Sequence, residues 1–332
     1  MKIIFSESSN LNNSIYGNCQ APIKMFLEKR GEEFEQNSVL KNLFLMGSSK
    51  NYGDVMTTLT AMSGFEPVGE NGAYPLDGMQ EGYQKFLKYQ TWKDSFSVSK
   101  EMIEDGKLLD MRKQPAAFMT SYKRTRELFG AALYGAAMMG NGSVTFKGVK
   151  FDLTGADGSN LFAKEHVPKV GGDKQCNCFK DAFSVDTLGK LETKMHLFRG
   201  DNDEILDVAP DTILIPENAD LKKAVFAAIG ADKDPVSANN AFNYQYGRWN
   251  VIVWPYLNHY ITNGVSPWVL LDSKYNETYG GAVWNDRIQL EARSTIDENT
   301  DANVWRGRSR FNACFNDWRF AAIGGIAAGN SL

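Results

Sequence analysis

The side chains best able to move protons or bind metals are scattered along this chain without catalytic spacing. The three histidines, His166, His196 and His259, show none of the H-E-x-x-H spacing of a helical metal site. The acidic run from Asp201 to Glu204 could hold a cation, but it lacks the glycine and distal glutamate of a calcium loop. Phosphate-loop and nucleophile-elbow motifs are also missing from the sequence. We therefore predict no catalytic residue, no cofactor and no metal site.

Cysteine is sparse, with Cys19, Cys176, Cys178 and Cys314 as its four occurrences. Cys176 and Cys178 form a C-x-C pair, which could supply half of a metal site. No second cysteine or histidine pair completes four ligands. So few cysteines favour reduced thiols over a disulfide framework.

Three arginines near the C-terminus could bind a partner molecule. Arg306, Arg308 and Arg310 alternate along a predicted strand, which places their side chains on one face. A guanidinium group suits carboxylates and phosphates, since it can donate two parallel hydrogen bonds. The stripe is therefore either a solvated sheet face or a surface that contacts another subunit or a phosphate. The alternation does not choose between them.

Four tryptophans in the last third of the chain suggest a different function. A sugar- or peptide-binding module could use aromatic rings as a platform, and core or interface anchors are the other interpretation. A soluble enzyme whose site cannot be recognised in sequence is a further alternative. The tryptophans concerned are Trp249, Trp254, Trp268 and Trp284.

Composition is that of a folded protein that does not bind nucleic acid specifically. The chain has 332 residues, 43% hydrophobic and 23% charged, which suggests about two domains. Its net charge of -4 lacks the basic excess that specific binding to phosphate needs. No apolar run is long enough for a membrane span, and the short run after Met1 is no signal peptide. We expect a cytoplasmic product without a long propeptide.

The first hundred residues predict an arm followed by a hairpin. Residues 1–54 are rich in Asn, Ser and Gly, with one predicted helix, Ile23–Arg30, after Pro22. Residues 55–97 consist of two predicted structured flanks around a glycine-rich middle. The Asn-Gly and Asp-Gly pairs of that middle favour turns. Aromatic residues between Tyr83 and Phe96 favour strand, although their spacing leaves a helix open.

The clearest helical pattern lies between residues 97 and 139. Ser99 is a predicted N-cap, and Pro115 suits the first turn of a helix of about 25 residues. Gly140 should end that helix. We place Glu127 on its polar face, with Lys123 and Arg124. Residues 143–153 then predict a hairpin that turns at Lys147-Gly148.

The remaining segments mix strands and helices, which indicates an α+β fold. Helices are predicted at Asp186–Leu197 and at Leu221–Ile229, the second capped by Asn218 or Asp220. The predicted strands are Thr212–Ile215, Trp249–Trp254 and Trp268–Leu271.

This order of segments resembles the major capsid proteins of tailed phages, especially the major head subunits of Mu-like phages. Residues 157–168 are similar to the family's D-G-x-x-L-F-x-x-x-H-P tract, with an extra residue before the proline. Leu214–Asn218 resembles the axial strand and turn, and Asp317–Arg319 resembles the start of the final strands.

The resemblance implies an α+β Johnson fold with an N-terminal arm, an extended β-hairpin loop, a long spine helix, a peripheral domain and an axial domain. Asn303–Asn316 would be the long peripheral strand, and Trp318–Gly324 would return to the axial sheet. The implied divisions are residues 1–54 (arm), 55–97 (extended loop), 98–185 (peripheral domain with the spine helix), 186–300 (axial domain), 301–317 (return strand) and 318–332 (final axial strand and C-terminus).

The resemblance also implies a function. The protein would assemble with itself into hexamers and pentamers of an icosahedral or prolate head that encloses double-stranded DNA. It would be synthesised and assembled in the cytoplasm of a bacterial host, and its location would be the virion. Its other partners would be a scaffolding protein, a portal and decoration proteins, with packaged DNA contacted only non-specifically and no membrane involved.

We expect the arm and the hairpin to find their partners on neighbouring copies. Some relatives join a lysine of the extended loop to an asparagine. Here residues 67–82 contain no lysine, and Lys85, Lys88 and Lys93 lie on the flank, so no autocatalytic crosslink is predicted. The predicted subunit interface comprises Pro67, Tyr74, Leu76, Tyr83, Phe86, Trp92, Arg306, Arg308 and Arg310.

Overall fold

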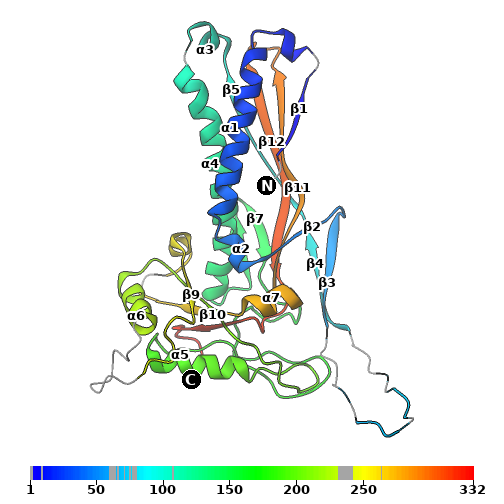
Figure 1. Cartoon of the computed structure of the whole chain (residues 1–332), viewed down its shortest axis with the longest axis vertical. Helices are drawn as coiled ribbons and strands as arrows, with labels where there is room; N and C mark the ends of the chain where they lie inside the picture. Colours follow the sequence, from blue (N-terminus) through cyan, green and yellow to red (C-terminus); the bar gives the residue numbers. More distant parts are fainter. Residues whose placement is uncertain are drawn as a thin grey trace.

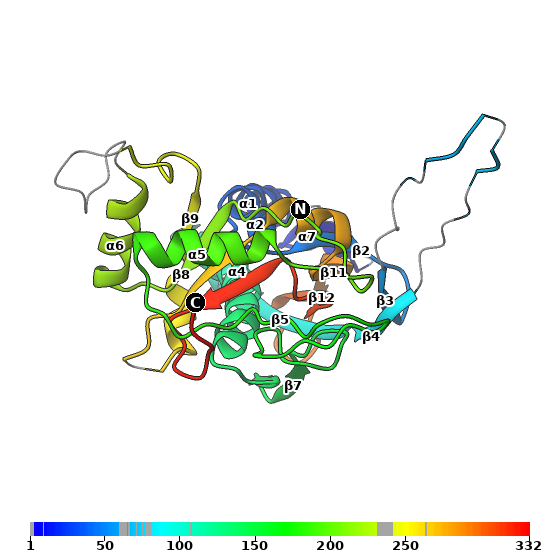
Figure 2. The same ribbon diagram turned by 90° about the horizontal axis from the view of Figure 1, so that it is seen from below.

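A computed structural model describes residues 3–8, 10–59, 65, 67–70, 72–74, 76, 81–106, 108–230, 242–262 and 264–332. The chain forms a tall part, in which two long helices lie beside a sheet of long strands, and a wider part at its base (Figure 1). A two-stranded hairpin projects from one side of the molecule, as the view from below also shows (Figure 2).

The tall part is built on two long antiparallel strands, β11 (Ala282–Ile296) and β12 (Asn303–Phe315). β5 (Gln90–Val98) adds to β12 in antiparallel orientation. β1 (Ile4–Glu7) and β2 (Leu45–Ser48) both run parallel to β11. The long return strand predicted at Asn303–Asn316 is confirmed. Residues 282–296 had been placed in the axial domain, and this is wrong, because β11 belongs to the sheet of β12.

Two helices, α4 (Leu108–Met138) and α1 (Gly17–Gln36), cover one face of this sheet (Figure 1). Short α3 (Lys100–Glu104) precedes α4, and Ser99 caps it by accepting a hydrogen bond from the backbone N–H of Met102, as predicted. Gly140, with φ of 74°, follows α4, also as predicted. Pro115 is not in the first turn: α4 has 31 residues and spans about 46 Å. Pro115 is buried, so packing compensates for the missing donor.

The N-terminal segment is packed on its own chain, which corrects the expectation of an arm that needs neighbours. α1 is much longer than Ile23–Arg30, because Ile23, Leu27 and Phe34 recur at helical spacing and are buried. The 3-10 helix η1 (Leu11–Asn13) precedes α1, and α2 (Leu40–Leu43) follows it. Together with β1 and β2, these elements tie the described part of residues 3–54 to the body.

The predicted hairpin exists, but it is shorter than residues 55–97. β3 (Gly53–Leu59) pairs with β4 (Glu81–Lys88) in antiparallel orientation. Tyr89 then leads directly into β5 of the long sheet, so the helical alternative for Tyr83–Phe96 is wrong. The second hairpin, β6 (Ser143–Phe146) and β7 (Val149–Asp152), is confirmed, and Lys147 and Gly148 at its turn have φ of 48° and 80°.

The base holds a four-stranded sheet in the order β13–β10–β8–β9. Its strands are β8 (Thr212–Ile215), β9 (Asn250–Val253), β10 (Trp268–Leu271) and β13 (Ala321–Gly324), and the predicted return of Trp318–Gly324 to this sheet is confirmed. Around it lie α5 (Val185–His196), α6 (Ala219–Ile229), the 3-10 helix η2 (Pro255–His259) and α7 (Ser273–Tyr279). Of the two predicted caps of α6, Asn218 is the one used.

One apolar core connects the base to the tall part, running from α2 and α4 to the four-stranded sheet. Trp254, Trp268 and Trp284 are fully buried in it, and Trp249 packs against it. The idea of a tryptophan platform for sugars or peptides is therefore wrong for the three buried rings. Among the described residues, no helix is both long enough and apolar enough to span a membrane.

Candidate assembly surfaces

The residues that could do chemistry are used in packing. His166 is 1% exposed, with its Nδ1 2.7 Å from an Asp157 carboxylate oxygen and its Nε2 3.1 Å from the Asn177 amide oxygen. Its ring stacks on Trp318 at 4.1 Å. His166 therefore joins the Asp157–Pro168 tract to the C-terminal strands. In the described part of the chain, no group of three or more His, Cys, Asp or Glu residues could hold a metal, and all four cysteines are free thiols.

The acidic run at residues 201–204 is neutralised by arginine. Arg319 donates to Asp201 at 2.9 Å and to Asp317 at 3.3 Å, and all three side chains are almost fully buried. The Tyr275 hydroxyl donates to Asp317 at 2.9 Å, and burial next to that carboxylate raises the pKa of Tyr275. Arg199 pairs with Asp203 at 2.9 Å. Asp201 and Asp203 of the run are thus both paired with arginines of the body.

A second buried ion pair, which the sequence analysis missed, fastens α4 to the long sheet. Arg126 donates to both carboxylate oxygens of Asp286, at 2.7 and 3.0 Å. Its guanidinium lies 4.8 Å from the ring centres of both Trp284 and Phe311. Burial lowers the pKa of Arg126, but the Tyr122 hydroxyl and the Asp286 carboxylate together outweigh it and raise the pKa, so the guanidinium stays charged.

Glu127, predicted on the polar face of the long helix, is buried instead. It is 3% exposed and accepts a hydrogen bond from the Ser38 hydroxyl at 2.8 Å. Burial raises the pKa of its carboxyl group. The error arose because the α2 segment covers this side of α4, and helical spacing alone cannot reveal such a contact.

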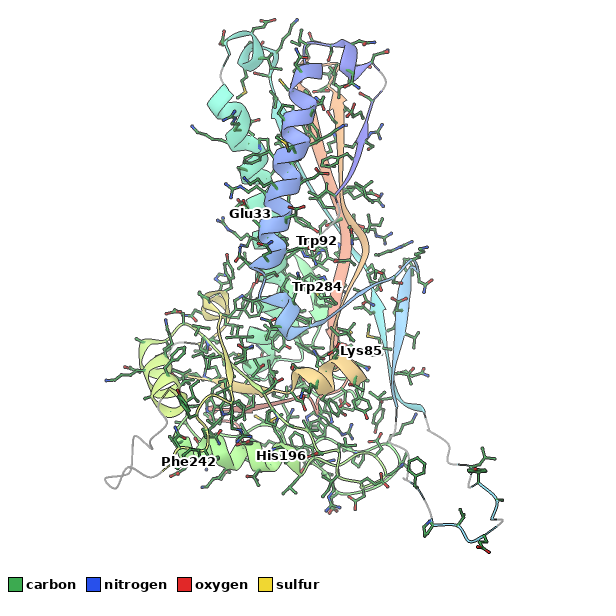
Figure 3. All side chains as sticks on the ribbon, in the orientation of Figure 1. Glu33, Lys85, Trp92, His196, Phe242 and Trp284 are labelled. Carbon is green, nitrogen blue, oxygen red and sulfur yellow. The ribbon has the colours of Figure 1, made fainter. Side chains whose placement is uncertain are left out.

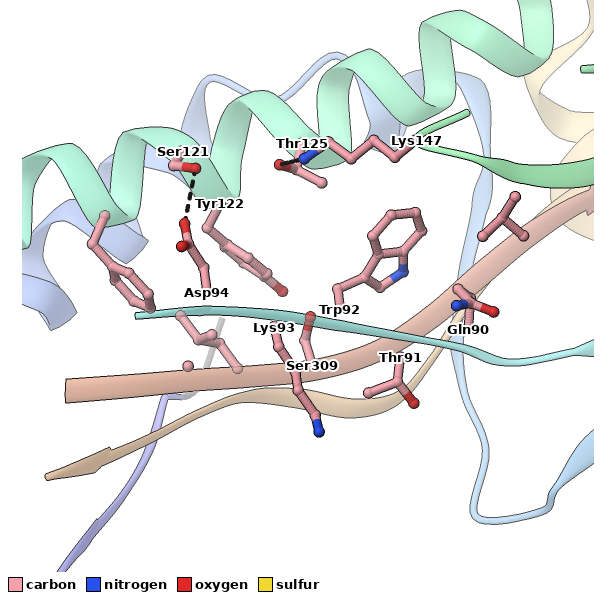
Figure 4. A pocket seen from close by; sticks show the side chains of 14 residues that line it. Gln90, Thr91, Trp92, Lys93, Asp94, Ser121, Tyr122, Thr125, Lys147 and Ser309 are labelled. Carbon is pink, nitrogen blue, oxygen red and sulfur yellow. Dashed lines mark hydrogen bonds between the residues drawn. The ribbon is translucent and has the colours of Figure 1, made fainter. Parts of the chain in front are cut away.

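Trp92, predicted at a subunit interface, is an internal anchor. Figure 4 shows it in the cleft between α4 and strands β5 and β12. Its ring stacks on Phe311 at 5.2 Å and lies 5.6 Å from Phe129, and its indole N–H donates to the Phe311 carbonyl at 3.3 Å. Near it, Ser121 donates to Asp94 at 3.1 Å across the cleft. Trp92 thus packs within its own chain but is only partly buried, and its place at a subunit interface stays a prediction.

The hairpin divides into an inner and an outer face. On the inner face Lys85 is 9% exposed, pairs with Asp152 at 3.1 Å and donates to the Thr154 carbonyl; its place at the base of the hairpin is labelled in Figure 3. Tyr83 donates to the Val167 carbonyl at 3.3 Å and so also contacts its own chain. On the outer face Phe86 is 56% exposed and Val55 is 60% exposed. Large apolar side chains in solvent mark this face as a contact surface.

The tip of the hairpin is described only in part, at residues 65, 67–70, 72–74 and 76. Of the predicted interface residues there, Pro67 is exposed, and Tyr74 and Leu76 are 96% and 103% exposed. Phe65 shows the same exposure, at 109%. The described side chains of the tip are therefore apolar and almost fully exposed.

The arginine stripe does lie on one face of the sheet, as predicted. In β12 Arg306 and Arg308 are exposed and Arg310 is partly buried, while Trp305 and Phe311 point to the helices. Arg308 lies 3.6 Å from Glu291, its partner on β11. Arg306 lies opposite Arg293, and like charges so placed repel one another. With Lys93 on β5 beside Arg308, the outer sheet face is basic.

Comparison with known proteins decides the family. The family model for phage capsid protein matches residues 83–324, which is most of the chain. The chain belongs to the phage capsid protein family. It is a structural protein of the head shell, a component of the virion that assembles with itself, and its α+β fold is the Johnson fold that the segment order predicted.

Solved structures of low sequence identity are similar as well. A chain of Mycobacterium phage Patience is 13% identical, with 100% of this chain and 94% of that chain covered and a TM-score of 0.47. A virus-like particle from Pyrococcus furiosus is 9% identical, with 91% and 97% covered and a TM-score of 0.46. The capsid of bacteriophage JBD30 is 12% identical, with 67% and 91% covered and a TM-score of 0.46. No curated protein matches significantly. The family assignment therefore rests on the sequence match.

Proposed function

We propose that this capsid protein is the repeating subunit that forms the hexamers and pentamers of a closed phage head around double-stranded DNA. The observation that carries the proposal is the apolar outer face of the hairpin, where Val55 and Phe86 face each other across the two strands and are each more than half exposed. Burying such side chains is worth about 1.5–3 kcal/mol each, so a neighbouring copy that covers them gains affinity at every contact. In a closed shell each subunit makes several such contacts at once, so weak individual contacts give a stable assembly.

The contrast between a tightly packed body and a projecting hairpin supports this arrangement. Two buried ion pairs and one continuous core hold the body together, so it can act as a rigid tile. The hairpin extends beyond the body (Figure 2) and can reach a neighbour without a change in the conformation of the body. The basic face of Arg306, Arg308 and Arg310 is a further contact surface, suited to a carboxylate of another chain.

We assign no enzymatic activity to the protein. His166 and Asp201 are buried and are held in packing contacts. Scaffolding and portal proteins, decoration proteins and non-specific contact with packaged DNA are its other proposed partners. Assembly in the cytoplasm of a bacterial host completes the proposal.

The hairpin face gives a direct test. The variant Val55→Ser with Phe86→Ser removes apolar area from side chains that touch no core, so the free subunit should keep its thermal stability. Shell formation, followed by sedimentation velocity and electron microscopy, should fall strongly. Tyr52→Ser is a matched control, since Tyr52 is 59% exposed near the same hairpin but packs against the amine of Lys88. Normal shells from the double variant would contradict the proposal.

A further inference from the structure

The tract at residues 157–168 belongs neither to the hairpin nor to the basic sheet face, yet it contains the most buried of the three histidines, His166. The ring of His166 stacks on Trp318 at 4.1 Å, and its Nε2 lies 3.1 Å from the amide oxygen of Asn177. The amide nitrogen of Asn177 in turn donates to the Ala321 carbonyl at 3.1 Å. Because Ala321 begins β13, the histidine fastens the tract to the sheet of the base.

The backbone around His166 is fixed as well. The His166 N–H donates to the Gln175 carbonyl at 2.8 Å, and the Gln175 N–H donates back at 3.1 Å. The Ala163 N–H donates to the amide oxygen of Asn177 at 3.0 Å. The Asp157 carboxylate lies 2.7 Å from the other ring nitrogen of the histidine. A segment held at this many points can act as a rigid support for whatever rests on it.

The residues that follow His166 hold the hairpin. The Lys169 amine donates to the Gly82 carbonyl at 2.6 Å and lies 5.9 Å from the ring centre of Tyr83. The Tyr83 hydroxyl donates to the Val167 carbonyl at 3.3 Å. These contacts join β4 to a stretch of chain that begins one residue after the buried histidine.

A second support for the hairpin comes from the residues just before the tract. Lys85 of β4 is 9% exposed, pairs with Asp152 at 3.1 Å and donates to the Thr154 carbonyl. At the root of the hairpin, where β4 leads into β5, Leu87 is buried in one cluster with Cys314 of β12. The hairpin is therefore fixed at its root by the long sheet and farther out by the segment that carries the histidine.

The outer support matters because of its distance from the root. Gly82 lies seven residues from Tyr89, which is about 23 Å along an extended strand. A swing of about 10° at the root would move Gly82 by about 4 Å. Val55 and Phe86, on the exposed outer face, would turn with the strands. The direction of that face relative to the body decides where a neighbouring copy can meet it.

We propose that His166 is a positioning residue for the hairpin: it holds Val167 and Lys169 where they fix Gly82 and Tyr83, and so sets the direction in which the hairpin projects. The inference rests on the proposed function of the hairpin as an assembly surface and names the residue that orients it. The competing explanation is that His166 only stabilises the base. The two differ in whether the hairpin of a folded subunit moves when His166 is replaced.

Distances between two spin labels on the free subunit measure the direction of the hairpin before any assembly. One nitroxide is attached to β4 through Gln84→Cys and the other to α5 through Lys190→Cys, both at exposed positions. Cys19→Ser and Cys176→Ser remove the two native thiols that are partly exposed. Pulsed electron paramagnetic resonance then gives a distribution of distances between the hairpin and the base.

Two variants should change this distribution in the same way. His166→Gln removes the ring that holds the tract, so the distribution should broaden and its mean should shift by about 4 Å. Lys169→Met with Tyr83→Phe leaves His166 in place and removes the side-chain contacts between tract and hairpin. It should give the same shift with little change in thermal stability, because both side chains lie at the surface.

Val225→Ala is the matched control for a loss of stability alone. Val225 is fully buried in α6, which lies on the opposite side of the base from the hairpin (Figure 1). The smaller side chain leaves a cavity and should lower the thermal stability. The distance distribution of this variant should match that of the labelled parent.

An unchanged distribution in folded His166→Gln, with stability reduced as in the control, would overturn the inference. If His166→Gln does not fold, the Lys169→Met, Tyr83→Phe variant decides alone, and an unchanged distribution there would overturn it equally. Where the distribution shifts, the yield of closed shells seen by electron microscopy should fall, and a normal yield would contradict the role in assembly. Absence of shells from the unmodified chain would remove the proposed function without altering the distances in the free subunit.

Discussion

Arg126 on α4 binds Asp286 on β11 through two hydrogen bonds, of 2.7 and 3.0 Å, inside a layer of aromatic rings. The pair connects the long helix to the long sheet near the middle of the tall part. Trp284 lies against the guanidinium, and its indole N–H also donates to Asp286 at 3.2 Å. The orientation of the helix on the sheet is therefore fixed by directional contacts as well as by apolar packing.

Breaking this pair should destabilise the subunit strongly. Arg126→Met leaves the Asp286 carboxylate, which is 20% exposed, without its cation, and the loss should cost about 1–3 kcal/mol in the free energy of unfolding. Urea unfolding of the free subunit measures it. The double variant Arg126→Met with Asp286→Leu also removes the unpaired carboxylate. It should recover a large part of the lost free energy of unfolding. If the single variant loses less than about 1 kcal/mol, the pair does not have this role.

Glu127 should make the subunit less stable as the pH rises. Burial raises the pKa of its carboxyl above the value in the unfolded chain, so the folded state binds the proton more tightly. The resulting stabilisation is complete below the unfolded pKa and is lost as the pH rises through the folded pKa.

Glu127→Gln should therefore unfold at a higher temperature than the unmodified chain at pH 7, with the difference shrinking towards pH 4. Thermal unfolding at a series of pH values measures this. The amide oxygen can still accept from Ser38, so the fold is kept. A variant that is less stable at pH 7 would show that the ionised carboxylate is needed.

Gly307 in β12 should tolerate no larger residue. A Cβ atom there would lie 2.3 Å from the ring of Phe118, which is buried beneath the long helix. Gly307→Ala should cost about 1–3 kcal/mol in the free energy of unfolding, because the ring must move. Gly69→Ala is the matched control, since nothing lies within 4 Å of a Cβ there. Equal stabilities of the two variants would contradict the tight packing of helix and sheet.

Mature shells should contain no isopeptide ladder. Residues 67–82 have no lysine, and Lys85 on the flank is held in its pair with Asp152. Lys88 and Lys93 are exposed, but neither lies at the tip. Lys88 is the last residue of β4, and Lys93 lies in β5 of the long sheet. Boiled, reduced shells should run as a single 37.0 kDa band, and higher multiples on that gel would disprove the prediction.

Local patterns predicted the elements well where the chain contacts itself nearby. The Ser99 and Asn218 caps and the Lys147-Gly148 turn depend on neighbours in sequence, and the structure confirms them. Family resemblance added the order of the segments. It also supplied the function, which no residue cluster could.

The main failures concern contacts between distant segments. The parallel pairing of β1 and β2 with β11 joins residues near the N-terminus to residues 283–294, and composition suggested a loose arm instead. Glu127 was misplaced for the same reason, because burial by a remote segment leaves no local periodicity.

Electron cryo-microscopy of particles formed by the unmodified chain, with a scaffolding protein supplied if needed, tests the central claim most directly. We predict closed shells of hexamers and pentamers in which the β3–β4 hairpin of each copy contacts the next. A monodisperse 37.0 kDa monomer at high concentration, under conditions in which the scaffold is active, would contradict it.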